Sequence, residues 1–192
     1  MAKGILFVIA APSGAGKTTL IRRIREQIPD LIYSISCTTR APRKGEIDGV
    51  HYYFLSRDKF EKMVEQDKFL EWKEVHGNLY GTPIDPVQHV LAQGKRMVLD
   101  IDVEGAKEVF RKVPEAVGIF VNAPDMATLE KRLRSRGTES DEVIATRLRN
   151  AQKEIASAGI FQHQIINGKL NKAVEDLGNI IRMASKNMAQ TT

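Results

Sequence analysis

The chain has 192 residues, with 29 Lys and Arg against 24 Asp and Glu, so its formal net charge is +5 with neutral histidines. Hydrophobic residues make up 42% of the chain and charged residues 28%, which is typical of a globular domain and excludes the disordered and fibrous classes. The early apolar run 5–11 is too short to span a bilayer and lacks the flanks of a secretory signal. The single cysteine, Cys37, cannot form an internal disulfide. We therefore expect a cytoplasmic protein.

The predicted elements alternate between strands and helices. The continuous apolar run 5–10 is typical of a parallel strand covered on both faces, and a glycine turn and an amphipathic helix ending near Ile28 follow it. Further strands are predicted over 31–36, 97–102, 117–121 and 164–166, and further helices over 83–93, 103–113, 125–134, 140–157 and 170–183. This alternation predicts an α/β fold with helices on both faces of a parallel sheet.

Two segments interrupt the alternation. Residues 37–81 are polar and turn-rich, and seven of the twelve aromatic residues lie between positions 52 and 80. Short strands over 52–55 and 69–72 and a helix over 58–66 predict a small antiparallel insertion, with Phe69 and Trp72 in its core. Residues 125–158 form a pair of arginine-rich helices joined at 136–138, which we interpret as a mobile flap.

The segment APSGAGKTT at 11–19 fits the phosphate-loop pattern G-x-x-x-x-G-K-[ST] at Gly16, Lys17 and Thr18. Gly14 and Gly16 allow the backbone to turn its amides toward one anion, and the following helix adds its positive N-terminal end. Ala11 replaces the first glycine. If its φ angle must be positive, the strain is about 1 kcal/mol or more, whereas at a simple strand end the change is harmless. The predicted nucleoside-triphosphate site comprises Ala11, Pro12, Ser13, Gly14, Ala15, Gly16, Lys17, Thr18 and Thr19, with the Thr18 hydroxyl as a ligand of Mg²⁺.

A second anion site is predicted in the insertion. Arg40 and Arg43 stand three residues apart, and Tyr52 follows nine residues later. Arginine forks suit a dianionic phosphate because they form bidentate bonds of fixed geometry. The string T-T-R-x-P-R-x-G-E-x-x-G-x-x-Y-x-F at 38–54, together with the phosphate loop, resembles the guanylate kinases, and the resemblance extends over about residues 4–184.

The resemblance implies a three-layer P-loop fold with a core of residues 4–35, 83–124 and 160–184, a mixed α/β GMP-binding insertion at 36–82 and a helical lid at 125–159. It implies a nucleoside monophosphate kinase that transfers the γ-phosphoryl group of ATP to GMP with Mg²⁺. Of the expected GMP contacts, Arg40, Arg43, Tyr52 and Tyr80 hold the phosphate, and Ser36, Glu71, Thr82 and Asp100 contact the guanine. Carboxylates and hydroxyls complement the N1–H and N2–H₂ donors of guanine, whereas adenine would leave the carboxylates facing an acceptor.

The resemblance also assigns Arg132, Arg136 and Arg147 to the lid. With Lys17 and Arg40, these cations would neutralise the charge that spreads over the moving phosphoryl group. Asn167 is expected near the adenine of ATP. No general base is expected, because the phosphate of GMP, with a second pKa of about 6, is already largely ionised.

The alternative is a non-catalytic guanylate-kinase-like scaffold that binds phosphopeptides through Arg40, Arg43 and Tyr52, but the chain keeps Lys17 and Thr18. Neither nucleic acid nor a membrane is expected as a partner, since acids interleave with the basic residues and no run of five like charges occurs. The four histidines lack metal-ligand spacing. The sequence does not distinguish a monomer from a homodimer.

Overall fold

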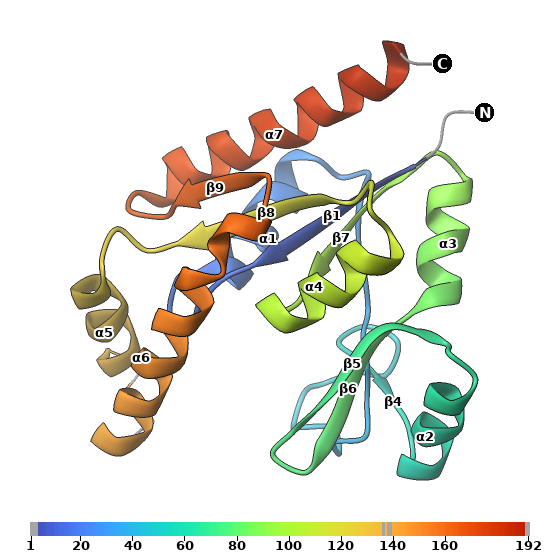
Figure 1. Ribbon diagram of the computed structural model, residues 1–192, viewed down its shortest axis with the longest axis horizontal. Helices are drawn as coiled ribbons and strands as arrows, with labels where there is room; N and C mark the ends of the chain where they lie inside the picture. The colour runs from blue at the N-terminus through green and yellow to red at the C-terminus, as the bar shows by residue number, and fades with distance from the viewer. Residues whose placement is uncertain (1–3, 136, 138–139, 191–192) are drawn as a thin grey trace.

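The structure is a computed structural model that describes residues 4–135, 137 and 140–190, with the backbone alone for 187–190 (Figure 1). Its centre is a sheet in the order β2–β7–β1–β8–β9, in which every pairing is parallel. The strands are β1 (Ile5–Ala10), β2 (Leu31–Tyr33), β7 (Arg96–Asp100), β8 (Val117–Asn122) and β9 (His163–Ile166). The α/β architecture expected from the sequence is confirmed.

Helices cover both faces of this sheet, as a continuous apolar strand requires. Phe7 and Ile9 of β1 are buried with side chains of α1 (Lys17–Gln27) and α7 (Leu170–Gln190). Leu6 and Val8 are buried on the other face with side chains of α3 (Ile84–Ala92) and α4 (Val103–Lys112). Because side chains alternate across a strand, one apolar run supplies two separate cores.

A second, smaller sheet is inserted between β2 and α3. Its order is β4–β3–β6–β5, and it mixes parallel and antiparallel pairs. The elements are β3 (Cys37–Thr38), β4 (Tyr53–Phe54), α2 (Arg57–Glu65), β5 (Phe69–Val75) and β6 (Asn78–Pro83). Phe60 of α2 stacks on Phe69 of β5, with ring centroids 4.4 Å apart, and both are buried. Trp72 was expected in this core, but it is 48% exposed, because β5 turns Glu71 inward and therefore turns its neighbour outward.

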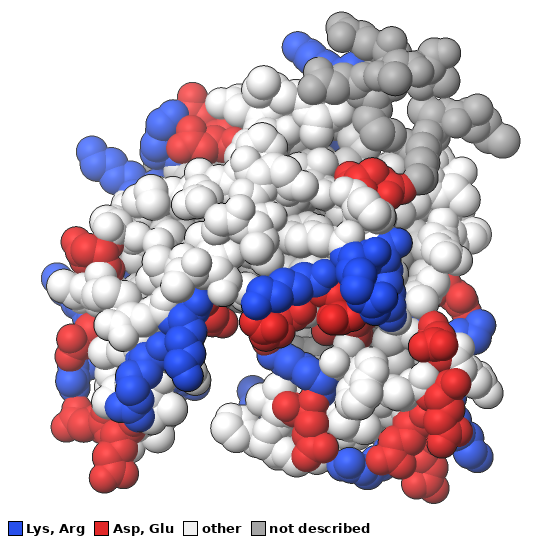
Figure 2. Space-filling view, in the orientation of Figure 1, with Lys and Arg blue, Asp and Glu red and all other residues white. Residues whose placement is uncertain are grey.

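The helices α5 (Met126–Arg134) and α6 (Asp141–Ala156) form an arm beside the large sheet. Leu129 and Leu133 of α5 and Ile144 and Ala151 of α6 are buried, so the arm is anchored by its apolar faces. Figure 2 shows the surface hollowed between this arm and the small sheet. The phosphate loop, which follows β1, and the carboxyl ends of the neighbouring parallel strands lie at this opening. Ligands of open α/β sheets bind at this edge of the sheet.

Several boundaries differ from the sequence-based prediction. β2 ends at Tyr33 rather than at 36, β7 ends at Asp100 rather than at 102, and α7 extends to Gln190 rather than to 183. Asp102 instead caps α4, where its side chain accepts a hydrogen bond from the backbone N–H of Gly105 at 2.8 Å. Within the described residues, no helix is long and apolar enough to cross a membrane.

Candidate active site

The phosphate loop joins β1 to α1. Gly14 and Gly16 have φ angles of 91° and 87°, the left-handed region that favours glycine. Gly16 also has no room for a side chain, because an added Cβ would lie 2.6 Å from the amide nitrogen of Asn167. Gly16 caps α1 without any side-chain hydrogen bond, so the first amides of the helix are available to an anion. Thr18 and Thr19 are exposed on this first turn.

Ala11, which stands where the pattern has its first glycine, is not strained. Among the described residues other than glycine, only Asp67 and His76 have positive φ angles. Ala11 follows the last residue of β1, is buried, and belongs to the apolar core between the sheet and α1. Alanine at position 11 therefore causes no backbone strain.

Lys17 points from the start of α1 across the ends of β1 and β7. Its Nζ lies 2.8 Å from Oδ1 of Asp100 and also donates to the backbone carbonyl of Ile101. The hydroxyl of Tyr33 reaches Oδ2 of the same aspartate at 3.4 Å. Burial and the nearby Asp100 carboxylate raise the pKa of Tyr33, which keeps this tyrosine protonated. Asp100 thus links the phosphate loop to the sheet.

A polar cavity of about 290 Å³ opens beside Lys17. Five residues predicted to bind GMP line it, namely Ser36, Tyr52, Glu71, Tyr80 and Asp100. The rings of Tyr52 and Tyr80 meet edge to face, with centroids 6.0 Å apart. Burial, and then the neighbouring Tyr80, raise the pKa of Tyr52. The residues that the structure adds to this cavity are Lys73, Val75, Gly81, Ile101 and Asp102.

Glu71 and Thr82 form a buried pair at the wall of the cavity. They lie opposite each other in the β5–β6 ladder, and the Thr82 hydroxyl donates to Oε1 of Glu71 at 2.6 Å. Glu71 is 7% exposed and Thr82 is 1% exposed. Burial raises the pKa of Glu71, and the Thr82 hydrogen bond opposes this rise. Thr82 is therefore hydrogen-bonded to the Glu71 carboxylate but is not among the residues that line the cavity.

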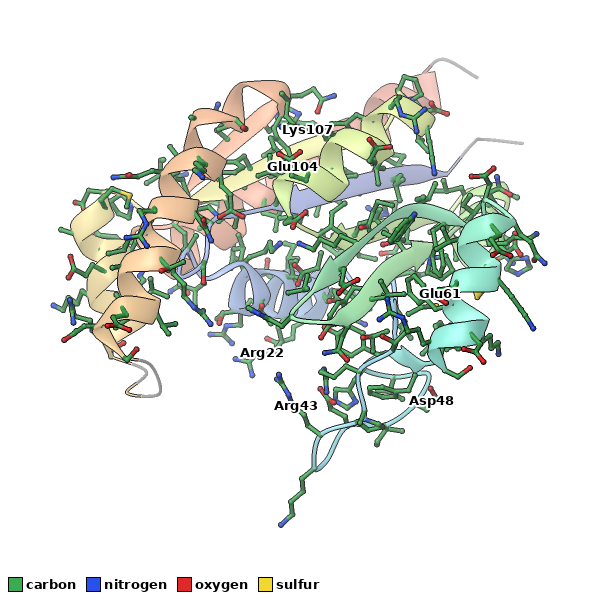
Figure 3. The ribbon with its side chains drawn as sticks, turned by 60° about the horizontal axis from the view of Figure 1, so that its bottom comes forward. Arg22, Arg43, Asp48, Glu61, Glu104 and Lys107 are labelled. Atoms are coloured by element: carbon green, nitrogen blue, oxygen red, sulfur yellow. The ribbon has the colours of Figure 1, made fainter. Side chains whose placement is uncertain are left out.

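Arg40 is held in place by Glu46. Its two terminal nitrogens donate to the two carboxylate oxygens at 3.0 and 2.9 Å, and the guanidinium lies over the ring of Tyr52, 5.6 Å from its centroid. The Arg40 hydrogen bond, followed by that of the Arg43 backbone N–H, lowers the pKa of Glu46 to about 2. The Arg43 side chain extends from the same loop toward α1 (Figure 3).

The arm meets the phosphate loop through two arginines. Arg132 of α5 donates to the backbone carbonyls of Ala15 at 3.3 Å and of Asn167 at 2.7 Å, and Arg147 of α6 donates to Oγ of Ser13 at 3.1 Å. Asn167 is buried and its side-chain amide donates to the same Ala15 carbonyl at 2.8 Å, so it contacts the loop backbone. Arg136, the third predicted lid arginine, lies outside the described residues.

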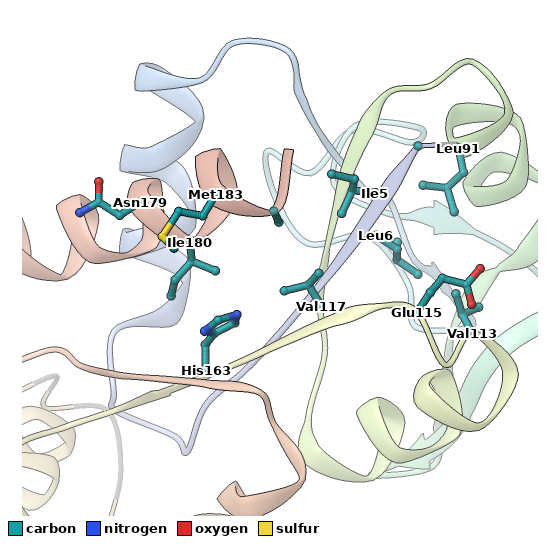
Figure 4. Close-up of a pocket in the computed structure, with 12 residues that line it drawn as sticks. Ile5, Leu6, Leu91, Val113, Glu115, Val117, His163, Asn179, Ile180 and Met183 are labelled. Carbon is teal, nitrogen blue, oxygen red and sulfur yellow. The ribbon is translucent and has the colours of Figure 1, made fainter. Parts of the chain in front are cut away.

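A second cavity is separate from this site. It is an apolar groove of about 620 Å³ lined by residues such as Ile5, Leu91, Val117, Ile180 and Met183 (Figure 4). It lies at the beginning of β1, whereas the phosphate loop follows the end of that strand. The groove lacks the convergent charged groups of the polar cavity, so we place the chemistry at the loop.

Comparisons with known proteins identify the family. The family model described as guanylate kinase matches residues 3–184. The chain belongs to the guanylate kinase family. It is 49% identical over 181 residues to a guanylate kinase of Carboxydothermus hydrogenoformans, which covers 94% of this chain and 89% of the relative. It is 45% identical to a guanylate kinase of Rubrobacter xylanophilus over 182 residues, 95% of each protein.

A solved structure agrees with this membership. The crystal structure of guanylate kinase from Anaplasma phagocytophilum superposes with a TM-score of 0.76 at 28% identity, covering 96% of this chain and 88% of that one. A shikimate kinase from Bacteroides thetaiotaomicron, at 14% identity and a TM-score of 0.53, shares the fold alone.

Lys73 and Glu154 are among the charged residues near the site that had no role in the sequence-based prediction. Lys73 follows Glu71 by two positions on β5, so period-two alternation could have placed both on one face. Glu154 follows Arg147 by seven positions on α6, which places both on one face of that helix. Burial lowers the pKa of Lys73 and raises that of Glu154, and the charge of each opposes the shift of the other.

Proposed function

We propose that the protein transfers the γ-phosphoryl group of ATP to GMP, giving ADP and GDP. The observation that carries this proposal is the contact between Lys17 and Asp100. It joins a phosphate loop, which suits a donor triphosphate, to a carboxylate-lined cavity, which suits guanine. Two nucleotides bound on either side of this contact would bring their phosphates together at Lys17.

On the donor side, the amides of the phosphate loop and the start of α1 would bind the ATP phosphates, with Lys17 turning from Asp100 toward them. The exposed Thr18 hydroxyl is an oxygen donor of the kind that Mg²⁺ prefers, so it would hold the ion together with the phosphates. The ion, when bound, neutralises charge on the β and γ phosphates.

On the acceptor side, Arg40, Arg43, Tyr52 and Tyr80 would bind the GMP phosphate. Glu46 holds Arg40 in a fixed orientation, so this arginine meets the phosphate preorganised. Glu71 and Asp100 would accept hydrogen bonds from the guanine N1–H and N2–H₂ groups, with Ser36 at the same edge. AMP would leave these carboxylates without donors, which accounts for a preference for GMP.

The chain would divide into three parts. Residues 4–35, 83–124 and 160–184 would form the core, residues 36–82 the GMP-binding insertion and residues 125–159 the lid. Closure of the hollow between the arm and the small sheet would bring Arg132 and Arg147 to the transferring group and exclude water. The phosphate of GMP needs no general base, because it is already ionised near neutral pH.

A panel of acceptors tests the proposal. Purified protein with ATP and Mg²⁺ is given GMP, AMP, CMP or UMP, and diphosphate formation is measured by chromatography. GDP should form with the highest kcat/KM. Absent GMP turnover, or equal turnover of AMP, would overturn the proposal. ATP binding without any phosphoryl transfer would favour the scaffold alternative.

A further inference from the structure

Gly105 is a glycine inside a helix, at a position where the backbone does not require one. It is buried in the first turn of α4, and its φ angle is not positive. Alanine would suit this backbone better, because glycine is among the least favourable residues in a helix interior. A glycine at such a position needs a packing reason, and the side chains around it supply one.

The carboxylate of Glu71 borders the space that a side chain at position 105 would fill. A Cβ added to Gly105 would lie 3.0 Å from Oε2 of Glu71 and 3.3 Å from its Cδ, closer than ordinary van der Waals contact. The other near atom is Oδ1 of Asp102, at 3.3 Å, which accepts the hydrogen bond from the backbone N–H of Gly105. Gly105 is therefore the point at which α4 meets the carboxylate that we assign to guanine.

Two contacts hold α4 against β5, one at each end of the helix. Asp102, which caps the start of α4, forms an ion pair with Lys73 of β5. Lys112, the last residue of α4, donates from Nζ to the backbone carbonyl of Phe69, the first residue of β5, at 2.7 Å. Gly105 lies between these two contacts, so a shift of the helix would not make room for a larger residue without breaking one of them.

Glu71 is held on its other side. Its Oε1 accepts the 2.6 Å hydrogen bond from the Thr82 hydroxyl, and both side chains are buried. The carboxylate is thus enclosed between Thr82 at one oxygen and the bare first turn of α4 at the other, and it lines the acceptor cavity. A methyl group at position 105 would displace Oε2, and this would change either the Thr82 hydrogen bond or the place of the carboxylate in the cavity.

We infer that Gly105 is a positioning residue that sets where Glu71 meets the guanine base, and that it thereby contributes to the choice of acceptor. It acts through Glu71, by leaving the space that the carboxylate needs. A side chain at position 105 would move this acceptor by a few tenths of an ångström relative to the N1–H and N2–H₂ donors, and hydrogen bonds weaken when their geometry departs from the optimum. The inference rests on the proposed function, since it takes GMP as the ligand of the acceptor cavity.

The test compares Gly105→Ala with the wild type by calorimetric titration of the full-length protein with GMP, inosine monophosphate (IMP) and, separately, MgATP. IMP keeps the N1–H group but lacks the N2 amino group, so the ratio of the two Kd values reports the contact with N2–H₂. In Gly105→Ala the Kd for GMP should rise by about tenfold, the factor expected for one weakened charge-assisted hydrogen bond. The Kd for IMP should rise less, and the Kd for ATP should not change.

Gly178→Ala is the matched control. Gly178 is also a buried glycine within a helix, α7, and a Cβ added there would meet the guanidinium at the flexible end of Arg182, at 3.0 Å. The same substitution therefore changes a helix without touching the acceptor cavity. Gly178→Ala should bind GMP, IMP and ATP as the wild type does.

A second comparison, which needs no ligand, covers the case in which Gly105→Ala does not fold. Glu71→Ala removes the carboxylate that the new Cβ would meet. In the Glu71→Ala background, Gly105→Ala should raise the thermal midpoint, because alanine favours the helix and the carboxylate no longer opposes it. A midpoint that stays the same or falls in this background would place the conflict elsewhere, for example at Asp102, and would overturn the inference.

Wild-type affinities for GMP and IMP in Gly105→Ala would also overturn it, as would equal weakening of GMP, IMP and ATP, which is the pattern of a purely structural role. Failure of the wild type to phosphorylate GMP would refute the proposed function, whereas the affinity ratios and the thermal midpoints decide this inference.

Discussion

Replacing Thr82 with valine would test the buried Glu71–Thr82 pair at the wall of the acceptor cavity. Valine has nearly the same shape as threonine, so Thr82→Val removes the hydroxyl without opening a cavity. The hydroxyl donates to Glu71 at 2.6 Å, and both side chains are buried. The substitution therefore leaves a buried carboxylate oxygen without this donor.

The expected cost follows from the loss of that donor. Leaving a buried polar group unsatisfied costs about 2 kcal/mol, and more when the group is charged. For a chain of this size, such a loss of unfolding free energy lowers the thermal midpoint by about 6 °C. The KM for GMP should rise several-fold because Glu71 faces the acceptor cavity, whereas the KM for ATP should not change.

The loss of unfolding free energy caused by Thr82→Val should depend on pH. Burial raises the pKa of Glu71 above its usual 4.5, so the folded protein holds this proton more tightly than the unfolded chain. Protonated Glu71 therefore contributes to the free energy of unfolding in full below pH 4.5, and this contribution is lost as the pH rises through the pKa of Glu71 in the folded protein. Thr82 lowers that pKa, so Thr82→Val should raise it further, and the destabilisation should be larger near neutral pH than near pH 4.5.

Urea unfolding of the wild type and of Thr82→Val at the two pH values measures this difference, and steady-state kinetics measure the two KM values. Thr82→Ser, which keeps the hydroxyl, is the matched control and should stay close to the wild type in GMP binding. An unchanged unfolding free energy at neutral pH would refute the reasoning, as would a rise in the KM for ATP in place of GMP.

Three further substitutions test the loop and the acceptor arginine. Lys17→Ala should lower turnover by orders of magnitude with an unchanged far-UV circular dichroism spectrum, and near-wild-type activity would contradict its role at the phosphates. Ala11→Gly should leave kcat unchanged and should not raise the thermal midpoint, because Ala11 has no positive φ angle whose strain glycine could relieve. A higher thermal midpoint would contradict this reasoning. Glu46→Gln frees Arg40 and should raise the KM for GMP. In the wild type the ion pair between Glu46 and Arg40 should persist at every pH above 4.5 and break only toward pH 2, because the pKa of Glu46 is lowered to about 2. A loss of GMP affinity at mildly acidic pH that is absent from Glu46→Gln would contradict this prediction.

Local features of the sequence predicted most of the fold. The continuous apolar run of β1, the glycine turn and the amphipathic α1 are each specified by neighbouring residues, so their order could be predicted. β3 and β6 were not predicted as strands. β3 is only two residues long and pairs with strands distant in the sequence, whereas β6 forms a hairpin with β5 across the turn at His76 and Gly77. The expected burial of Trp72 was wrong for a related reason, since the inward face of β5 is chosen by its partners and not by hydrophobicity.

The same division applies to the site. The sequence alone determined the phosphate loop and the arginine–tyrosine pattern, because the residues of each motif are close along the chain and their chemistry depends on short-range backbone geometry. The contacts of Lys17 with Asp100, of Thr82 with Glu71 and of Arg147 on α6 with Ser13 could not be predicted from the sequence, because they depend on how the elements pair and pack. The first and third contacts join segments far apart in the sequence and depend on strand order and helix packing, and the second depends on the register of the β5–β6 hairpin. The net charge of +5 shows the same limit: its sign is read from composition, but which cations reach a phosphate is settled by where the fold places them.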